Sequence, residues 1–265
     1  MSKKLSSEDL KKLVDSSLNE LTEFTTELQT NKKNTVNLKR AMLLAYWIKD
    51  YVNFLRAEKN FNPTKMLRYK RGDIILVNFG FRIGSELGGR HFAMVLDNYN
   101  SQKSPIITVA PLDSLKGEYK ESCFTYLLEK GIYELQEEKY KNLVASCQQA
   151  LAELNIYVNQ EVVSEDDMEI FTKKVASVNR KIEEAKILQN ELLKLKTGSI
   201  VELGQITTIS KLRILNPKFP SDTLNKIRVA PDDLDKINKK IEYLYLCHQK
   251  KEDLVSPFID GMKKN

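Results

Sequence analysis

The chain has 265 residues, 42% of them hydrophobic and 29% charged, a composition typical of a soluble protein with core material for one large domain or two ordinary ones. A formal net charge of +6, from 42 basic and 36 acidic residues, permits a polyanionic partner such as nucleic acid but does not by itself indicate one. Three widely separated cysteines exclude a disulfide framework and a paired-cysteine metal knuckle, and the lack of a signal-like or membrane-spanning apolar run indicates a cytoplasmic protein without membrane contact.

Two amphipathic helices are predicted at the start of the chain. Apolar residues recur every three or four positions from Leu10 to Leu28, and Ser6 offers an N-cap. After a polar break at residues 31–34, the same spacing continues from Leu38 to Leu55 and stops at Asn62-Pro63. Helices so close in sequence form a hairpin, and its apolar faces must dock on the rest of the chain or on a partner.

Apolar runs rich in β-branched residues and bounded by Gly, Asn, Ser or Pro predict consecutive strands. These strands are expected at residues 73–79, 92–96, 106–112 and 122–128. Strand composition returns at residues 199–209, where Gly204 is interpreted as a bulge or a close backbone approach. The sheet is therefore expected to be interrupted and then resumed.

A second helical hairpin is predicted inside the sheet sequence. Its first helix covers about residues 134–154, and its second, capped by Ser164, has a coiled-coil-like apolar seam from Phe171 to Leu195. The economical arrangement is a four-helix bundle of the two hairpins, although docking of either hairpin on an external partner fits the sequence equally well. A last helix is expected from Pro231, followed by a loose polar tail at residues 249–265.

Four segments occur in a specific order: RGDIILVNFG, GSELGGRHFAMVLDN, SPIITVAPLDS and SIVELGQITTISKLRI. Together they resemble the MazF/PemK family of toxin endoribonucleases over a little under half of the chain. The resemblance implies an α+β fold with a small SH3-like antiparallel β-barrel. The expected divisions are an N-terminal hairpin at 1–66, the first part of the barrel at 67–133, an inserted hairpin at 134–196, the closing strand and C-terminal helix at 197–248, and the tail at 249–265.

The resemblance also implies a function. Members of this family cut single-stranded RNA without a metal or other cofactor, usually pair as homodimers and are neutralised by an antitoxin, which indicates a type II toxin-antitoxin or phage-defence system. Because the chain is about twice the family's usual size and departs from its motif, a second hypothesis is a catalytically inactive module that binds RNA or protein. A third is that residues 1–62 occupy the RNA groove in cis.

The departure from the family motif concerns the loop before the second strand. Much of the family has GGxRP there, with the Arg acting on the scissile phosphate, and a polar residue after the third strand assists. Here the loop contains Gly88, Gly89, Arg90 and His91, so the Arg comes one residue early. Because strand side chains alternate between faces, Arg90 and His91 reach one site only if the loop is irregular.

The candidate catalytic residues follow from what metal-free RNA cleavage requires. A histidine changes charge near neutral pH, so His91 can act as base or acid, and Arg90 can pair with phosphate oxygens. Asp113 can orient His91, and Ser114 can donate to phosphate. The alternative for His91 is a structural or incidental role, and for Asp113-Ser114 it is ordinary turn chemistry.

The remaining candidates concern RNA binding. The amides of Gly88 and Gly89 can approach RNA closely, although the two glycines also suit a plain hairpin turn. Glu86 either contributes to the site, holds Arg90 or solvates the loop. Lys70 and Arg71 belong to a basic strip that either follows an RNA backbone or is a solvated linker. The aromatic residues Phe79 and Phe92 are predicted to be core rather than base-stacking surfaces.

Overall fold

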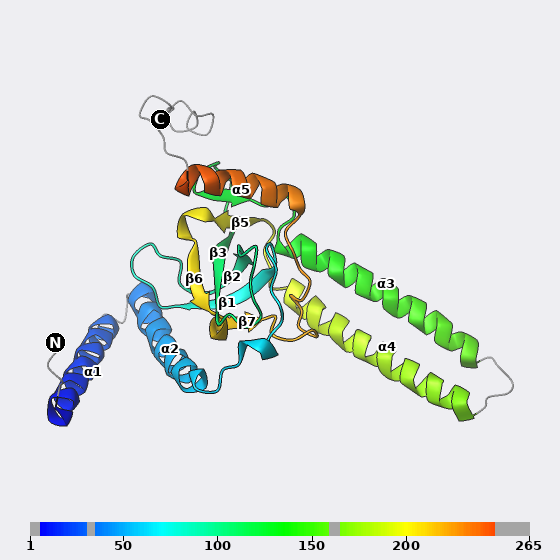
Figure 1. Cartoon of the computed structure of the whole chain (residues 1–265), viewed down its shortest axis with the longest axis horizontal. Coiled ribbons are helices and arrows are strands. Elements are labelled where there is room, and N and C mark those ends of the chain that lie inside the picture. The colour runs from blue at the N-terminus through cyan, green and yellow to red at the C-terminus, as the bar shows by residue number, and fades with distance from the viewer. Residues whose placement is uncertain (1–5, 31–34, 159–164, 247–265) are drawn as a thin grey trace.

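The structure is a computed structural model that describes residues 6–30, 35–158 and 165–246. These residues form five α-helices and seven strands, an α+β arrangement as expected (Figure 1). The helices are α1 (Ser7–Thr30), α2 (Thr35–Glu58), α3 (Ile132–Val158), α4 (Glu165–Leu192) and α5 (Pro231–Tyr245). The strands are β1 (Ile74–Gly80), β2 (Gly89–Val95), β3 (Ile106–Ser114), β4 (Thr125–Leu127), β5 (Ser199–Glu202), β6 (Thr207–Ser210) and β7 (Ile214–Asn216).

The strands pair antiparallel in the order β4-β5-β3-β2-β1-β7, and β6 also pairs with β3. Strand β3 is the centre of the sheet, because it pairs with β2, β5 and β6. It thereby joins the parts of the sheet before and after the inserted hairpin, as the sequence predicted. The pairing path ends at β4 and β7 without closing, so a closed SH3-like barrel stays a prediction.

Both faces of the sheet are buried, because successive side chains of each central strand alternate between two apolar clusters. The first cluster includes Ile74, Met94, Leu96, Ala110, Leu112, Val201, Leu224 and Ile237. The second includes Ile75, Val77, Phe79, Ala93, Val95, Ile107, Val109 and Ile209. The core role predicted for two aromatic residues is confirmed, since Phe79 is buried in the second cluster and Phe92 packs against the first.

The strand predicted at residues 199–209 is divided in two. A 3-10 turn at Leu203–Gln205 separates β5 from β6, so the prediction of one continuous strand is wrong. The reason is a contact with a distant segment, because the amide of Gly204 donates to the carbonyl of Phe124 at 3.1 Å and leaves the ladder. A Cβ at Gly204 would lie 3.3 Å from the Phe124 ring, so this glycine is the expected close backbone approach.

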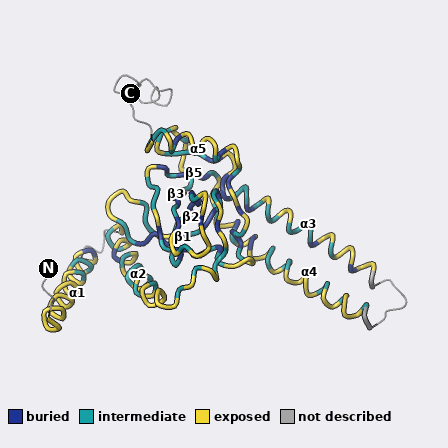
Figure 2. Tube along the Cα trace, in the orientation of Figure 1, coloured by how far each residue is buried: buried dark blue, intermediate teal, exposed yellow. Residues whose placement is uncertain are grey.

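The N-terminal hairpin forms as predicted but buries little of its apolar surface. The Asp9 amide donates to Ser6 Oγ at 3.1 Å, which confirms the N-cap. Four apolar side chains in the first half of α1 are exposed, and Figure 2 shows that half of the helix in the colour of exposed residues. They are Leu10, Leu13, Val14 and Leu18. The sheet is contacted instead by Trp47 of α2, which lies against Gly80.

The inserted hairpin packs along its predicted seam. The buried apolar side chains along this seam are Cys147 and Leu154 on α3 with Val178, Leu188 and Leu192 on α4, and Ile132 and Gln136 are buried at the start of α3. Figure 1 shows the two hairpins extending from opposite sides of the sheet, so they do not form the expected four-helix bundle. The physical reason is that each hairpin meets the sheet at a different edge, α2 at the end of β1 and α3 just after β4.

The last helix, α5, has Pro231 in its first turn as predicted and buries Ile237. Of the helices in the described ranges, none combines the length and apolar character needed to cross a membrane. The predicted break at 31–34, the cap at Ser164 and the tail at 249–265 lie outside the described residues.

Candidate active site

A cavity of about 250 Å³ opens where β2 begins, where β3 ends and where α4 gives way to β5; we call it the His91 cavity. All four predicted catalytic residues contribute to its wall. The lining residues are Arg90, His91, Phe92, Leu112, Asp113, Ser114, Ile132, Lys194, Leu195, Lys196, Gly198 and Ser199. Residues from four separate parts of the chain therefore meet at one place.

Strand pairing explains why these residues converge. On one side of the cavity, His91 and Arg90 pair with Val77 and Asn78 of β1. The β1–β2 register then shifts, because the next pair joins Gly80 to Gly89. This irregularity lies beside Arg90, and both Arg90 and His91 line the cavity although strict alternation would separate them.

The carboxylate of Asp113 does not hold His91. Its Oδ1 accepts from the Ser114 amide at 2.8 Å, and its Oδ2 lies 3.2 Å from Lys116 Nζ. The His91 side chain, half-buried, makes no hydrogen bond within the described part of the chain. The contact of Asp113 with the Ser114 amide is the turn chemistry that was predicted as the alternative to a catalytic role.

A neighbouring carboxyl group is also affected by Asp113. Burial, with the charge of Asp113 as a further cause, raises the pKa of Glu202 on β5.

The guanidinium of Arg90 has a partner that the sequence did not suggest. Its Nη2 lies 3.3 Å from Asp50 Oδ2 on α2, and the side chain is still 65% exposed. The same carboxylate oxygen accepts from Asn78 Nδ2 at 2.8 Å, which fixes its position beside the strand. Because an exposed ion pair of this kind is weak, Arg90 can exchange Asp50 for a phosphate oxygen.

Lys194 and Lys196 are cavity residues that sequence reasoning missed. Both are exposed and follow the end of α4, directly before the turn into β5. The available signal was the pair of lysines in Lys-Leu-Lys directly before Thr197-Gly198, the turn that leads into β5. With Arg90 they give the wall of the His91 cavity three basic residues, a composition that attracts phosphate.

The loop between β1 and β2 is held by Gln205, a second residue that sequence reasoning missed. Gln205 Oε1 accepts from the Leu87 amide at 2.6 Å, and its Nε2 donates to the Ser85 carbonyl at 3.4 Å. Glu86 lies between Ser85 and Leu87 in sequence. Its carboxylate is 3.4 Å from the Arg82 guanidinium and does not pair with Arg90. Gln205 thus orders the loop that carries Glu86.

The two glycines of this loop are required by its shape. Gly89 has a φ of +85°, in the left-handed region. A Cβ on Gly88 would lie 2.9 Å from the carbonyl oxygen of Gly80. Both glycines therefore form the tight entry into β2, and neither is a plain two-residue hairpin turn because the loop extends from Phe81 to Gly88.

Lys70 and Arg71 are not brought to the His91 cavity. Arg71 donates to the Leu96 carbonyl and to Asn238 Oδ1 on α5, and burial lowers its pKa. It precedes β1, whereas Arg90 pairs with the far end of that strand. Lys70 is exposed beside it, and its amide donates to Asp73 Oδ2 at 2.7 Å. These contacts tie the start of β1 to the fold.

A larger cavity of about 590 Å³ lies between α2 and the β1–β2 loop; we call it the α2 pocket. Its wall contains Leu43, Tyr46, Trp47, Asp50, Asn78, Gly80, Phe81, Arg82, Glu86, Gly88, Gly89 and Arg90. Arg90 lines both this pocket and the His91 cavity, so the two are neighbours, and its guanidinium contacts Asp50 of the α2 pocket.

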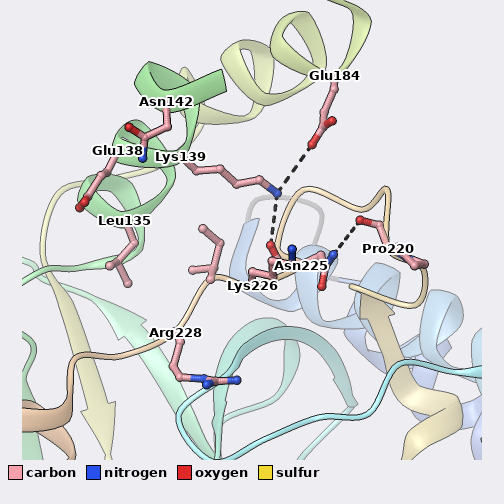
Figure 3. A pocket seen from close by; sticks show the side chains of 10 residues that line it. Leu135, Glu138, Lys139, Asn142, Glu184, Pro220, Asn225, Lys226 and Arg228 are labelled. Atoms are coloured by element: carbon pink, nitrogen blue, oxygen red, sulfur yellow. Dashed lines mark hydrogen bonds and ion pairs between the residues drawn. The ribbon is translucent and has the colours of Figure 1, made fainter. Parts of the chain in front are cut away.

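A third cavity, of about 460 Å³, lies where the inserted hairpin meets the loop before α5 (Figure 3). Lys139 extends into it and donates to the carbonyls of Thr223 at 2.9 Å and Asn225 at 3.2 Å, with Glu184 3.9 Å away. Burial lowers the pKa of Lys139. Because the Lys139 ammonium already has these partners, we interpret Lys139 as an anchor that holds the base of the hairpin to the loop before α5.

Across the described residues, His, Cys, Asp and Glu side chains do not gather in a group of three or more suited to a metal ion. Residues 70–184 match the family described as PemK-like, MazF-like toxin of type II toxin-antitoxin system. The matched range runs from the start of β1 into α4 and ends before β5. A search of curated proteins found no match.

Proposed function

Because residues 70–184 match the PemK-like, MazF-like toxin family, we propose that the chain is a toxin of this family that cleaves single-stranded RNA without a metal ion, as a cytoplasmic component of a type II toxin-antitoxin or phage-defence system. The observation that supports cleavage is the His91 cavity, whose wall contains His91 together with the basic residues Arg90, Lys194 and Lys196. A cognate antitoxin and a second copy of the chain, in a homodimer, are the protein partners that this proposal expects.

The proposed reaction uses the ribose of the substrate as its own nucleophile. A base removes the proton from the 2′-hydroxyl, the 2′ oxygen forms a bond to the adjacent phosphorus, and the bond from phosphorus to the 5′ oxygen breaks. The leaving oxygen takes up a proton, so the products carry a 2′,3′-cyclic phosphate and a 5′-hydroxyl. Both proton transfers fit general acid–base catalysis near neutral pH.

The cavity residues take distinct roles in this reaction. His91 performs one of the two proton transfers, with solvent performing the other, because imidazole accepts and releases protons near neutral pH. Arg90 pairs with the non-bridging phosphate oxygens once it leaves Asp50, and stabilises the negative charge that develops on these oxygens. Lys194 and Lys196 hold the phosphates on either side.

The test is incubation of the purified protein with a mixed RNA pool in EDTA, with mapping of the cut ends and their 2′,3′-cyclic phosphates. His91→Ala is expected to slow cleavage by about 100-fold or more, the usual contribution of a positioned acid or base. Arg90→Ala should also slow it strongly. Arg68→Ala is the matched control, because Arg68 is exposed and lines neither cavity. Full activity in both site variants would refute the assignment of the site.

A second candidate function is a regulatory module that binds RNA or protein without cutting RNA. The Arg90–Asp50 contact favours it, because α2 supplies a counterion to the guanidinium that the reaction needs. Wild-type protein that retains RNA in the same assay but leaves every strand intact would support this alternative over the nuclease.

A further inference from the structure

The α2 pocket has the character of a small-molecule site rather than of a gap between packed elements. Its volume of about 590 Å³ lies within the range of about 300–1,000 Å³ that such sites occupy. One wall is α2, which precedes the residues matched by the toxin family, and the other is the β1–β2 loop. The pocket thus joins the additional hairpin to the loop that enters the His91 cavity.

Aromatic side chains form much of this pocket. Trp47 is fixed as its floor, because its indole lies against Gly80 and the Arg213 guanidinium lies 5.1 Å from its ring centroid. Tyr46, which directly precedes Trp47 on α2, is 60% exposed, and its ring is accessible to a ligand. Phe81 lies across the pocket on the loop. Phe81 is half-buried, with the Arg40 guanidinium 5.9 Å from its ring centroid, so Tyr46 is the exposed ring beside the fixed indole on which a planar ligand can stack.

The polar groups of the pocket select among planar ligands. Asp50 and Glu86 present carboxylates, which accept hydrogen bonds and donate none. Asp50 Oδ2 is occupied by Asn78 and Arg90, whereas no contact is assigned to Oδ1 among the described residues. A ligand with an amino group on its edge would complement these acceptors.

We propose that the α2 pocket binds one unpaired RNA base that carries an exocyclic amino group. The base stacks on Tyr46 and Phe81, its amino group donates to Asp50 or Glu86, and its phosphate lies at Arg90. Single-stranded RNA is commonly recognised in this way, by stacking on aromatic rings and hydrogen bonding to base edges.

The position of Arg90 favours RNA over an apolar peptide as the occupant. Arg90 is a lining residue of both cavities, so a nucleotide whose base fills the α2 pocket would place its phosphate toward His91, Lys194 and Lys196. An apolar peptide has no anionic group that could pair with these cations. This inference rests on the proposed function and adds to it the site that selects the base.

The test uses the full chain and oligonucleotides of 2′-O-methyl cytidine or uridine, which lack the attacking hydroxyl and therefore report binding alone. Trp47 is the only tryptophan in the sequence, so its emission reports on the pocket directly. We expect oligocytidine to quench Trp47 at a several-fold lower concentration than oligouridine, because cytosine carries an amino group where uracil carries a carbonyl.

Substitution then separates the pocket from general electrostatic binding. Tyr46→Ala should weaken binding of oligocytidine about fivefold or more through lost stacking, with an unchanged denaturation midpoint, because the side chain is exposed. Tyr99→Ala is the control, because Tyr99 is 97% exposed and does not line the pocket; its affinity should equal that of the wild type. Equal binding by Tyr46→Ala and wild type, or equal quenching by the two oligonucleotides, would overturn the proposal.

Cleavage of unmodified RNA, measured in parallel, distinguishes this inference from the proposed function. Cleavage without quenching of Trp47 emission would support the proposed nuclease function and refute the base-binding site. Quenching that obeys the predictions above, without any cleavage, would establish the site on a protein that binds RNA and does not cut it.

Discussion

The contact between α2 and the sheet can be tested at Gly80. This glycine has a φ of +81°, and an added Cβ would lie 2.6–2.8 Å from three atoms of the Trp47 indole. Alanine at this position therefore faces two separate costs. The left-handed conformation costs about 1–2 kcal/mol for a residue with a Cβ, and overpacking against the ring costs about 1–3 kcal/mol. Gly80→Ala should lower the free energy of unfolding by about 2–5 kcal/mol.

Gly84 provides a control that separates the two costs. It also has a left-handed backbone, with a φ of +61°, but nothing lies within 4 Å of a Cβ placed there. Gly84→Ala should therefore lose only the conformational part, about 1–2 kcal/mol. The difference between the two variants measures the contact with Trp47.

The assay is urea denaturation of both variants, followed by circular dichroism and by Trp47 emission. In Gly80→Ala the emission of the folded protein should shift to longer wavelength, because α2 can relieve the clash by moving away from β1. Equal losses of stability in the two variants, with unchanged Trp47 emission, would refute the docking of α2 on the end of β1.

Two further predictions concern buried polar groups. Burial, with nearby carboxylates, raises the pKa of Tyr69. The stability that its protonated hydroxyl contributes is therefore present below pH about 10 and is lost as the pH rises through the folded-state pKa. The fall in denaturation midpoint at alkaline pH should be smaller in Tyr69→Phe than in the wild type. Lys240 is buried and donates to the carbonyls of Ser122 at 2.9 Å and Thr125 at 3.0 Å. Lys240→Met should lower the free energy of unfolding, measured by urea titration, by about 2–4 kcal/mol. The control is Lys236→Met, at an exposed position on the same helix, which should leave the denaturation midpoint nearly unchanged. Equal midpoints for these two variants would contradict the buried role of Lys240.

The strands were predictable because their signals are local. The runs that form β1 and β3 are rich in β-branched residues, that of β2 contains the apolar stretch FAMV, and all are bounded by turn residues, so a short window of sequence contains the evidence. The split between β5 and β6 was less accessible. It depends on the hydrogen bond from Gly204 to Phe124, a residue 80 positions earlier, and only the folded chain brings them together.

The closing segment shows how a motif can be recognised before its physical role is known. Its family-like residues hold loops of the folded chain. Gln205 holds the β1–β2 loop, Lys211 donates to the Ser101 carbonyl at 3.0 Å, and Arg213 donates to the carbonyls of Asn78 and Phe79. These partners are more than 100 positions away in sequence, so no spacing within the motif could identify them.

The candidate site divides in the same way. Sequence alone identified the order of the strands, the inserted hairpin and the candidates His91, Arg90, Asp113 and Ser114, because residue type and a family-like order are written along the chain. Tertiary structure decided which of them meet, since strand register brings them to one cavity, whereas Arg71 is held at the other end of β1. It also decided their neighbours: Asp50 comes from α2 and Lys194 from the end of α4. Contacts between distant segments depend on how the hairpins dock on the sheet, and that docking follows from packing rather than from any local pattern.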